Sequence, residues 1–373
     1  MENFNPKKQL KLYGLDHLRA LAILLVLGFH YQSFFPHPLW TEWFDTIGWT
    51  GVDLFFVLSG FLISSQLFAQ IKKGNSISLK TFFIKRFFRI LPIYFFIVGI
   101  YFLFPIFREK EALPPLWKFF TFTQNFGLDN KHFGTFSHAW SLCVEEHFYL
   151  FLPLILIFLQ GRNLFGKSYW ILIALFIIGI LLRIYIWNIY FSTSVTDASR
   201  TDWSQLIYYP TYTRLDGLLA GVSIAALNQF APKIWDKISK WGNYLILLSL
   251  VLLTVIYFFF VGTDYYSSVW GFPLISIAYG LLVAGAISPS SFLYNWNSRI
   301  TTLIATLSYA MYLFHKGIIH IVQGLFAKSG IDANSNLTLL ICIALCIVVA
   351  WLLHISIEKP FMKMRDKIIG QKI

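Results

Sequence analysis

Residues 242–262 read GNYLILLSLVLLTVIYFFFVG, and none of these twenty-one side chains carries a charge. A helix needs about 20 apolar residues to cross a hydrocarbon core of about 30 Å. Similar runs recur along the 373 residues, of which 57% are hydrophobic and 13% charged, and the mean hydropathy is +0.63. The sequence therefore predicts an all-helical integral membrane protein.

The apolar runs predict ten transmembrane helices in one bundle. Their expected ranges are 16–35, 51–70, 88–107, 139–160, 168–190, 214–230, 242–262, 269–287, 301–326 and 337–358. The connecting segments contain no low-complexity stretch, internal repeat or second soluble domain. We expect one domain over residues 1–373, with its core at about 11–360.

Lysine and arginine are distributed unequally between the loops. Twenty lie on the side of the termini and seven on the opposite side. Since cytoplasmic loops carry the excess of basic residues, we expect both termini in the cytoplasm of a bacterium and the protein in its inner membrane. Segments 108–138 and 191–213 then lie outside, and the longer one, 108–138, is a candidate lid or re-entrant segment. The first run is long and lacks a small-residue cleavage site, so it is a retained helix and not a signal peptide.

The net charge of +12 raises the possibility of a nucleic-acid partner. The basic residues, however, lie in short loops between apolar runs, which is the membrane pattern and not a basic face, so we expect no nucleic acid. Cys143, Cys342 and Cys346 lie in apolar runs without metal-site or disulfide spacing. We expect them to be packing residues, and we expect no metal centre.

Two ionisable residues of the first predicted span, Arg19 and His30, are candidates for function. Arg19 and His30 are eleven residues apart, about three helical turns, and therefore share one face about 16 Å apart along the axis. Ionisable groups within a membrane are functional candidates by default. The alternative is that Arg19 reaches lipid phosphate and His30 is a hydrogen-bonded packing residue.

The second predicted span begins with the sequence GVDLFFVLSGF at 51–61. Asp53 is expected at a depth similar to that of His30, where a carboxylate fixes the tautomer of an imidazole and raises its basicity. The alternative for Asp53 is a charge in the first turn, which the helix dipole favours. Gly60 is expected to allow close helix packing.

A basic cluster precedes the third predicted span. Arg86 and Arg89 are three residues apart on one helical face, next to Lys85. Three cations beside an apolar run suit the phosphates of a nucleotide-containing donor. A topogenic and lipid-binding cluster is the alternative.

The head of the fourth predicted span is unusually polar. It reads HAWSLCVEEHFYL at 138–150, in which His138 and Glu145 share a face and Ser141 lies between them. These side chains are expected to face a polar cavity or a substrate, and a structural polar network is the alternative. Arg214 and Asp216 open the sixth span, where we expect them either to form a substrate site or to pair with each other or with neighbours. Tyr312 and His315 in the ninth span are expected to line a cavity, and His354 in the last is expected to pack.

These segments together, in order from Leu15 to Pro360, resemble the acyltransferase-3 family. The matching pieces are Arg19 with His30; the 51–61 segment; Arg86, Arg89 and Pro92; Trp140 to Leu150; Arg214, Asp216 and Leu218; and Ser308 to His315. The family transfers acyl groups, commonly acetyl, to cell-surface glycans and some small glycosides. The resemblance implies that the chain shares the membrane fold of that family. It also implies an O-acyltransferase activity that uses acyl-CoA, with no permanently bound cofactor.

The resemblance also implies residue roles. His30 is the expected catalytic histidine, with Asp53 and Glu145 as its candidate carboxylates, and Arg19, Arg86 and Arg89 are expected to bind the acyl donor. The expected substrate-binding residues are Trp140, Ser141, Arg214, Asp216 and His315. Some members add an extracytoplasmic esterase-like domain, which we do not expect after Ile373, so a separate acyl-handling partner is one expectation. His147 stands where many relatives have Gln.

In the expected mechanism, a donor from the cytoplasm reacts with an acceptor nearer the outer face of the membrane. A donor held by its phosphates at the cytoplasmic arginines would extend its thioester along the first span toward His30. His30 would deprotonate the hydroxyl of a glycan or lipid-linked saccharide, or accept the acyl group itself. The rival prediction is a transporter without covalent chemistry, which would use the same intramembrane charges. A non-catalytic scaffold leaves those charges unexplained.

Overall fold

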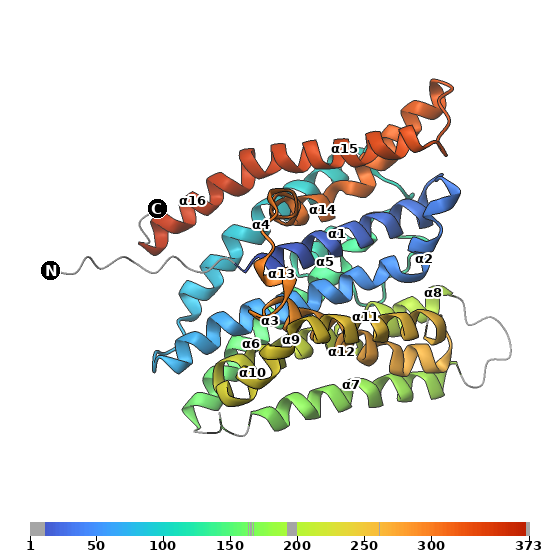
Figure 1. Cartoon of the computed structure of the whole chain (residues 1–373). Helices are drawn as coiled ribbons and strands as arrows, with labels where there is room; N and C mark the ends of the chain where they lie inside the picture. The colour runs from blue at the N-terminus through green and yellow to red at the C-terminus, as the bar shows by residue number, and fades with distance from the viewer. Residues whose placement is uncertain are drawn as a thin grey trace.

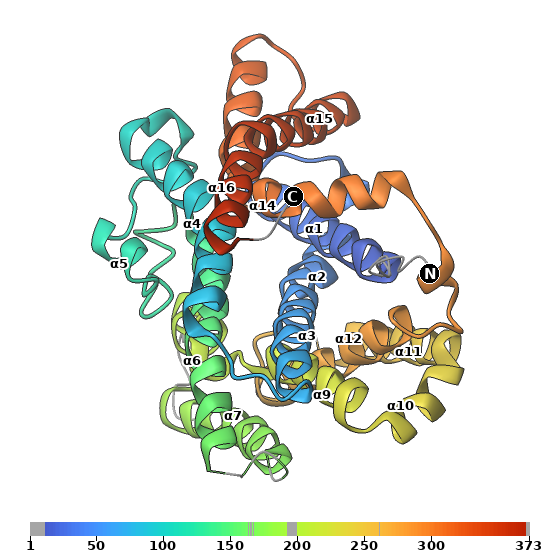
Figure 2. The ribbon, with the colours of Figure 1, turned by 90° about the vertical axis from the view of Figure 1, so that its left-hand side faces the viewer.

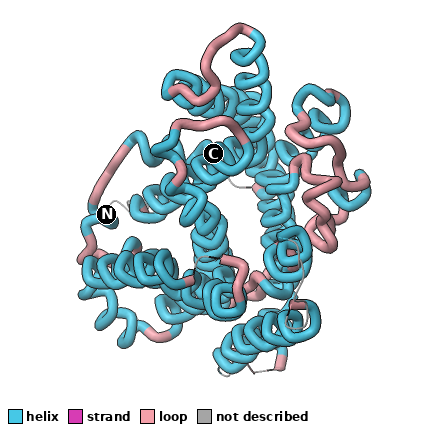
Figure 3. The backbone as a smooth tube through the Cα atoms, turned by 90° about the vertical axis from the view of Figure 1, so that its right-hand side faces the viewer, coloured by secondary structure: helices cyan, strands magenta, loops and turns pink. Residues whose placement is uncertain are grey.

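The computed structural model describes residues 12–162, 164, 166, 168–191, 200–260 and 262–370, with the side chains of residues 200 and 201 left out. Within these residues the chain is helical and contains no strand (Figure 3). Five residues of the predicted basic set, Lys7, Lys8, Lys11, Lys167 and Lys372, lie outside the described residues. The prediction of an all-helical fold is confirmed for the described part of the chain.

Ten longer helices overlap the ten predicted ranges. They are α1 (Tyr13–Phe34), α3 (Gly51–Lys72), α4 (Leu79–Leu103), α6 (Trp140–Gly161), α7 (Tyr169–Tyr190), α9 (Asp216–Phe230), α11 (Gly242–Phe259), α12 (Phe272–Ala286), α14 (Arg299–Lys328) and α15 (Asn336–Leu353). The shorter helices are α2 (Trp43–Ile47), α5 (Leu116–Phe120), α8 (Arg200–Trp203), α10 (Pro232–Ile238), α13 (Phe292–Asn295) and α16 (Lys359–Ile369).

Seven segments of the described chain are long and apolar enough to cross a membrane, and they contain α3, α4, α6, α7, α11, α12 and α15. The chain is therefore a multi-pass membrane protein. Of the other three long helices, α9 has only 15 residues, whereas α1 and α14 carry most of the buried histidines. The apolar signal is thus weak in α1 and α14, which carry His30 and His315.

Two boundaries differ from the sequence prediction for identifiable reasons. Helix α4 begins at Leu79, not near residue 88, because Ser78 caps it: the Ser78 hydroxyl accepts a hydrogen bond from the Thr81 amide at 3.3 Å. The basic cluster is thus part of α4. At the other end of the chain, Glu358 to Pro360 does not stop the last long helix. A π-helical turn over His354–Glu358 leads into α16, whose first turn accommodates Pro360.

The helices form one bundle, which Figure 1 shows from the side and Figure 2 from one end. Helix α3 lies near the middle of the end-on view in Figure 2, next to α1 and α9. The apolar window of the α12 span is 78% buried, whereas that of α7 is only 11% buried. The start of α1 and the end of α16 lie at the same end of the bundle, at the left of Figure 1.

Close packing of α3 on α9 depends on glycine. A Cβ atom on Gly60 would lie 2.2 Å from the backbone oxygen of Leu218, and one on Gly221 would lie 2.2 Å from that of Val57. No side chain fits at such a distance, so the two backbones approach directly, as small residues permit in membranes. The packing role predicted for Gly60 agrees with this contact.

Candidate active site

A cavity of about 360 Å³ lies between α1, α3, α4, α6 and α14. One part of its wall is cationic, because Arg19, Arg86 and Arg89 all line it. Helix α1 supplies the first arginine, and the amino-terminal extension of α4 supplies the other two. The three arginines predicted to bind a donor are therefore brought to one cavity.

These arginines lack carboxylate partners. Among the described residues, none of the three forms an ion pair within 4.0 Å, and the Nη2 group of Arg86 donates only to the Gln66 side chain, at 3.2 Å. The buried Nε atom of Arg86 has no hydrogen-bond partner among the described residues. Three guanidinium groups that line one cavity without an ion-pair partner among the described residues favour a multivalent anionic ligand.

Glu145 lines the same cavity from α6. Its two carboxylate oxygens accept hydrogen bonds from the Ser59 hydroxyl at 2.8 Å and the Tyr149 hydroxyl at 3.1 Å. The carboxylate thus faces α3 and the arginine cluster. The sequence left open whether Glu145 is the partner of His30, and these contacts do not connect the two residues.

The far wall of the cavity holds a hydroxyl pair. The Ser141 and Tyr312 oxygens are 2.6 Å apart, and both residues line the cavity. The Tyr312 hydroxyl also donates a short hydrogen bond to the backbone oxygen of His138. Because a carbonyl can only accept, Tyr312 uses its proton there and Ser141 must donate to Tyr312. This pair connects the cavity to His138.

Three buried histidines meet directly beyond that pair. His30 comes from α1, His315 from α14, and His138 from the short 3-10 turn Ser137–Ala139 before α6. Their ring centroids are 4.9 Å apart for His30 and His315, 5.0 Å for His138 and His315, and 5.7 Å for His30 and His138. We call these three residues the histidine cluster. The described residues contain no group of three side chains arranged to hold a metal ion.

The hydrogen bonds of the cluster determine which nitrogens carry protons. The Nδ1 atom of His315 lies 2.9 Å from the Tyr312 carbonyl oxygen and 3.1 Å from that of Met311, so it must be the protonated nitrogen. The Nε2 atom of neutral His315 is therefore an acceptor, and it lies 2.8 Å from Nδ1 of His30. His30 must donate from Nδ1, which leaves Nε2 as its basic nitrogen.

The sequence expectation for the partner of His30 was wrong. Asp53 and Glu145 were the candidates, but the hydrogen-bonded partner is His315. Asp53 instead pairs with Arg214: an Nη2 to Oδ1 distance of 2.7 Å joins two buried side chains. Sequence spacing gives the depth of Asp53 in its helix but not which helix faces it, so depth alone suggested the wrong pair.

Arg214 and Asp216 form ion pairs with neighbours, which is one of the two alternatives from the sequence. The Asp216 carboxylate receives two hydrogen bonds from Arg183 of α7, at 2.7 and 3.0 Å. The guanidinium of Arg214 lies 4.1 Å from the ring centre of Phe272 and 5.2 Å from that of Trp140. These contacts account for the burial of both arginines. A substrate-binding role for Trp140, Arg214 and Asp216 stays a prediction.

Sequence reasoning missed Arg183, although it is the only charged residue in an otherwise apolar span, which was a usable signal. It also missed Glu109 and Lys316. Nζ of Lys316 lies 2.8 Å from Oε1 of Glu109, and both side chains are buried. Lys316 follows His315 directly, so this ion pair lies next to the histidine cluster.

The Glu109–Lys316 pair also attaches segment 108–138 to α14. The Phe136 amide donates to Oε1 of Glu109 at 3.1 Å, which draws the two ends of the segment together just before His138. Further along, the Asn125 side chain donates to the Tyr209 carbonyl oxygen at 3.1 Å. The segment is thus packed against the bundle. A role as a lid or re-entrant segment stays a prediction.

Residues 12–355 match the acyltransferase-3 family, which is described as an acyltransferase domain. The chain belongs to this family. A protein of Staphylococcus aureus (strain COL) with a provisional O-acetyltransferase name is 31% identical over 379 residues, which cover 96% of this chain and 58% of that protein. The O-acetyltransferase OatA of Staphylococcus aureus (strain NCTC 8325 / PS 47) is 29% identical over 366 residues, which cover 94% and 57%. This chain thus spans little more than half the length of these relatives. No solved structure matches it significantly.

Proposed function

We propose that this member of the family transfers an acyl group, most simply acetyl, from acyl-CoA to a hydroxyl group of a cell-surface glycan or lipid-linked saccharide. The observation that supports this most is the single cavity with two chemically different walls. Three arginines without an ion-pair partner among the described residues line one part, and the Ser141–Tyr312 pair, which contacts the histidine cluster, lines another. Such a cavity suits a donor with phosphates at one end and a thioester at the other.

The arginines would hold the phosphates of the donor. Arg19 and His30 are separated by eleven residues of one helix, about 16 Å along the axis, so a donor bound at Arg19 must extend toward His30. The extended arm of coenzyme A has the required shape. Glu145, held by Ser59 and Tyr149, would line the passage between the two ends.

His30 would then act as a general base through Nε2. It removes the proton of the acceptor hydroxyl while the hydroxyl oxygen attacks the thioester carbonyl carbon. The carbon–sulfur bond breaks, and the coenzyme A thiolate leaves and takes the proton from His30. The products are an ester and a free thiol, so protons and electrons balance. His315 holds the ring of His30 in the tautomer that this step needs.

We further propose ten membrane crossings, with both termini in the cytoplasm of a bacterium and the protein in its inner membrane. Most of the described basic residues of the termini side lie at the end of α3, at the start of α4, in and just after α10 and in α16. Helices α10 and α16 lie toward the end of the bundle where α1 begins (Figure 1). This distribution supports the positive-inside orientation. In this proposed orientation the cationic part of the cavity would face the compartment that contains acyl-CoA.

The decisive test uses purified protein in lipid nanodiscs with acetyl-CoA labelled in the acetyl group and a panel of bacterial glycans. Label in an alkali-labile ester on a glycan, with stoichiometric release of free thiol, would support the proposal. Label that accumulates on the protein would favour the two-step route through acyl-His30. Unmodified glycan that crosses the membrane of a proteoliposome without thiol release would identify a transporter instead.

A further inference from the structure

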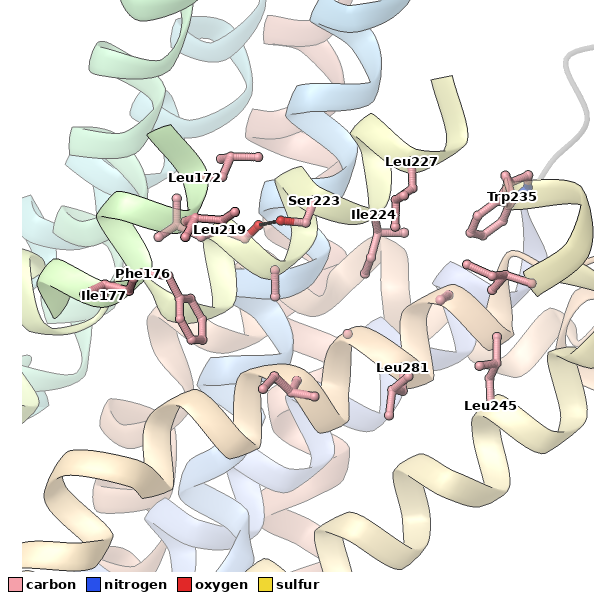
Figure 4. A pocket seen from close by; sticks show the side chains of 16 residues that line it. Leu172, Phe176, Ile177, Leu219, Ser223, Ile224, Leu227, Trp235, Leu245 and Leu281 are labelled. Atoms are coloured by element: carbon pink, nitrogen blue, oxygen red, sulfur yellow. Dashed lines mark hydrogen bonds between the residues drawn. The ribbon is translucent and has the colours of Figure 1, made fainter. Parts of the chain in front are cut away.

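A second hollow lies on the lipid-facing side of the bundle, separate from the cavity described above. It has a volume of about 530 Å³ and is formed by α7, α9, α10, α11 and α12. Figure 4 shows Phe176 of α7, Leu219 and Ile224 of α9, and Leu281 of α12 around it. We call it the lateral groove.

The groove arises from small side chains at helical spacing. Ala220 and Ser223 of α9 line it together with Gly280 and Ala284 of α12, and each pair lies on one helical face. A Cβ atom on Gly280 would be 3.7 Å from the nearest side-chain atoms, on Ala220 and Ile224, so a methyl group fits there without a clash. The 15 residues of α9 also extend only about 22 Å, less than the thickness of a hydrocarbon core.

The chemistry of the lining excludes a polar ligand from the groove interior. The only hydroxyl among the lining residues is that of Ser223, and it donates to the Leu219 carbonyl oxygen at 2.8 Å in its own helix. No charged side chain lines the groove. Because α7 is mostly exposed, the groove faces the bilayer, and a hydrocarbon chain is the occupant that matches this lining.

One end of the groove is positively charged. Helix α10 contributes Trp235 and Ile238 to the lining, while its lysines Lys233 and Lys237, one turn apart, are exposed. Lys240 is exposed two residues after α10, and Asp236 is the one acidic side chain among them. Among the described residues, none of these three lysines forms an ion pair within 4.0 Å. The same short helix thus offers an apolar inner face and cations at the surface.

We propose that the lateral groove is a specific site for an anionic phospholipid. One acyl chain lies along α9 between α7 and α12, and the phosphate contacts Lys233, Lys237 and Lys240. Charge complementarity at α10 selects an anionic headgroup over a zwitterionic one. The site is independent of the transfer chemistry, since it shares no lining residue with the donor cavity.

Native mass spectrometry of the detergent-purified full chain tests this proposal. The probes are phosphatidylglycerol and phosphatidylcholine with identical acyl chains. We expect one phosphatidylglycerol to be retained per chain, with an affinity about tenfold above that for phosphatidylcholine. Equal affinity for the two lipids, or no retained lipid of either kind, would overturn the proposal.

Two variants separate the headgroup from the groove. Lys233→Gln/Lys237→Gln/Lys240→Gln should abolish the preference for phosphatidylglycerol. Lys73→Gln/Lys80→Gln, on exposed lysines at the end of α3 and the start of α4, should preserve it.

Gly280→Leu should fill the groove and abolish retention of both lipids, whereas Gly280→Ala fits the available space and should not. Unchanged lipid binding by Gly280→Leu at an unchanged melting temperature would place the lipid elsewhere. If Gly280→Leu does not fold, Ala284→Phe makes the same test from the next turn of α12.

Discussion

The Nδ1 atom of His30 lies 2.8 Å from the Nε2 atom of His315, and the other ring nitrogen of His315 faces two backbone carbonyl oxygens. These carbonyls fix the proton of His315 on Nδ1, which in turn fixes the proton of His30 on Nδ1. His315 therefore takes the place that a carboxylate occupies in hydrolase triads, as the group that orients the base. His315 is a positioning residue for His30 in this account.

The first prediction concerns this orientation. His315→Leu should lower kcat about 100-fold or more with little change in the KM for acyl-CoA, because the wrong tautomer of His30 cannot accept the hydroxyl proton. His315→Gln should recover part of this loss, since the side-chain carbonyl of Gln can accept from Nδ1 of His30. Steady-state kinetics on both variants gives the answer. Equal activity of His315→Leu and wild type would show that the contact is only packing.

The second prediction concerns the donor. Arg86→Ala and Arg89→Ala should each weaken acyl-CoA binding about tenfold, because a charge-assisted contact to phosphate is lost. The kcat at saturating donor should change much less. Isothermal titration with a non-reactive coenzyme A analogue measures the affinity, and Lys80→Ala, on the same helix outside the cavity, is the control. Unchanged affinity in both arginine variants would leave the cluster with a topogenic role alone.

The third prediction concerns the buried Glu109–Lys316 pair. Glu109→Gln and Lys316→Met should each destabilise the protein by roughly 3–5 kcal/mol, because each leaves a buried charge without its partner. The double variant Glu109→Gln/Lys316→Met should cost less than either single change. Thermal unfolding in detergent compares the three. Asp366→Asn, in the partly exposed Arg365–Asp366 pair, should shift the melting temperature little. Additive effects of the two single changes would contradict a direct pairing.

The fourth prediction concerns orientation. A cysteine at Lys131 should react with a membrane-impermeant maleimide added to intact cells, and a cysteine at Asn75 should react only after the cells are opened. Both positions are exposed, and the native cysteines Cys143, Cys342 and Cys346 are buried, so the background should be low. The reverse labelling pattern would invert the proposed topology and move the cationic part of the cavity away from cytoplasmic acyl-CoA.

Much of the fold could be predicted from the sequence because apolar length and basic loops are local signals. Every predicted range overlaps a long helix, and the residues expected at a donor site line one cavity. Helix periodicity gives the face and depth of a residue but not its neighbour across the bundle. Asp53 and Arg214 are separated by 161 residues, and no local pattern relates them. For the same reason His315 was expected to line a cavity and bind substrate but not to contact His30, and the Glu109–Lys316 pair was not foreseen.

The most direct test of the central claim, that His30 is the base, is glycan acylation measured by mass spectrometry in cells that carry His30→Gln or His30→Ala at matched protein levels. An amide can form hydrogen bonds but cannot accept a proton at neutral pH, so both variants should be inactive. Purified His30→Gln should still bind the coenzyme A analogue, because the arginines are unchanged, and His354→Ala should remain active as a control. Near-normal acylation by His30→Gln would contradict the account, since it would show that His30 serves only as a hydrogen-bonding residue.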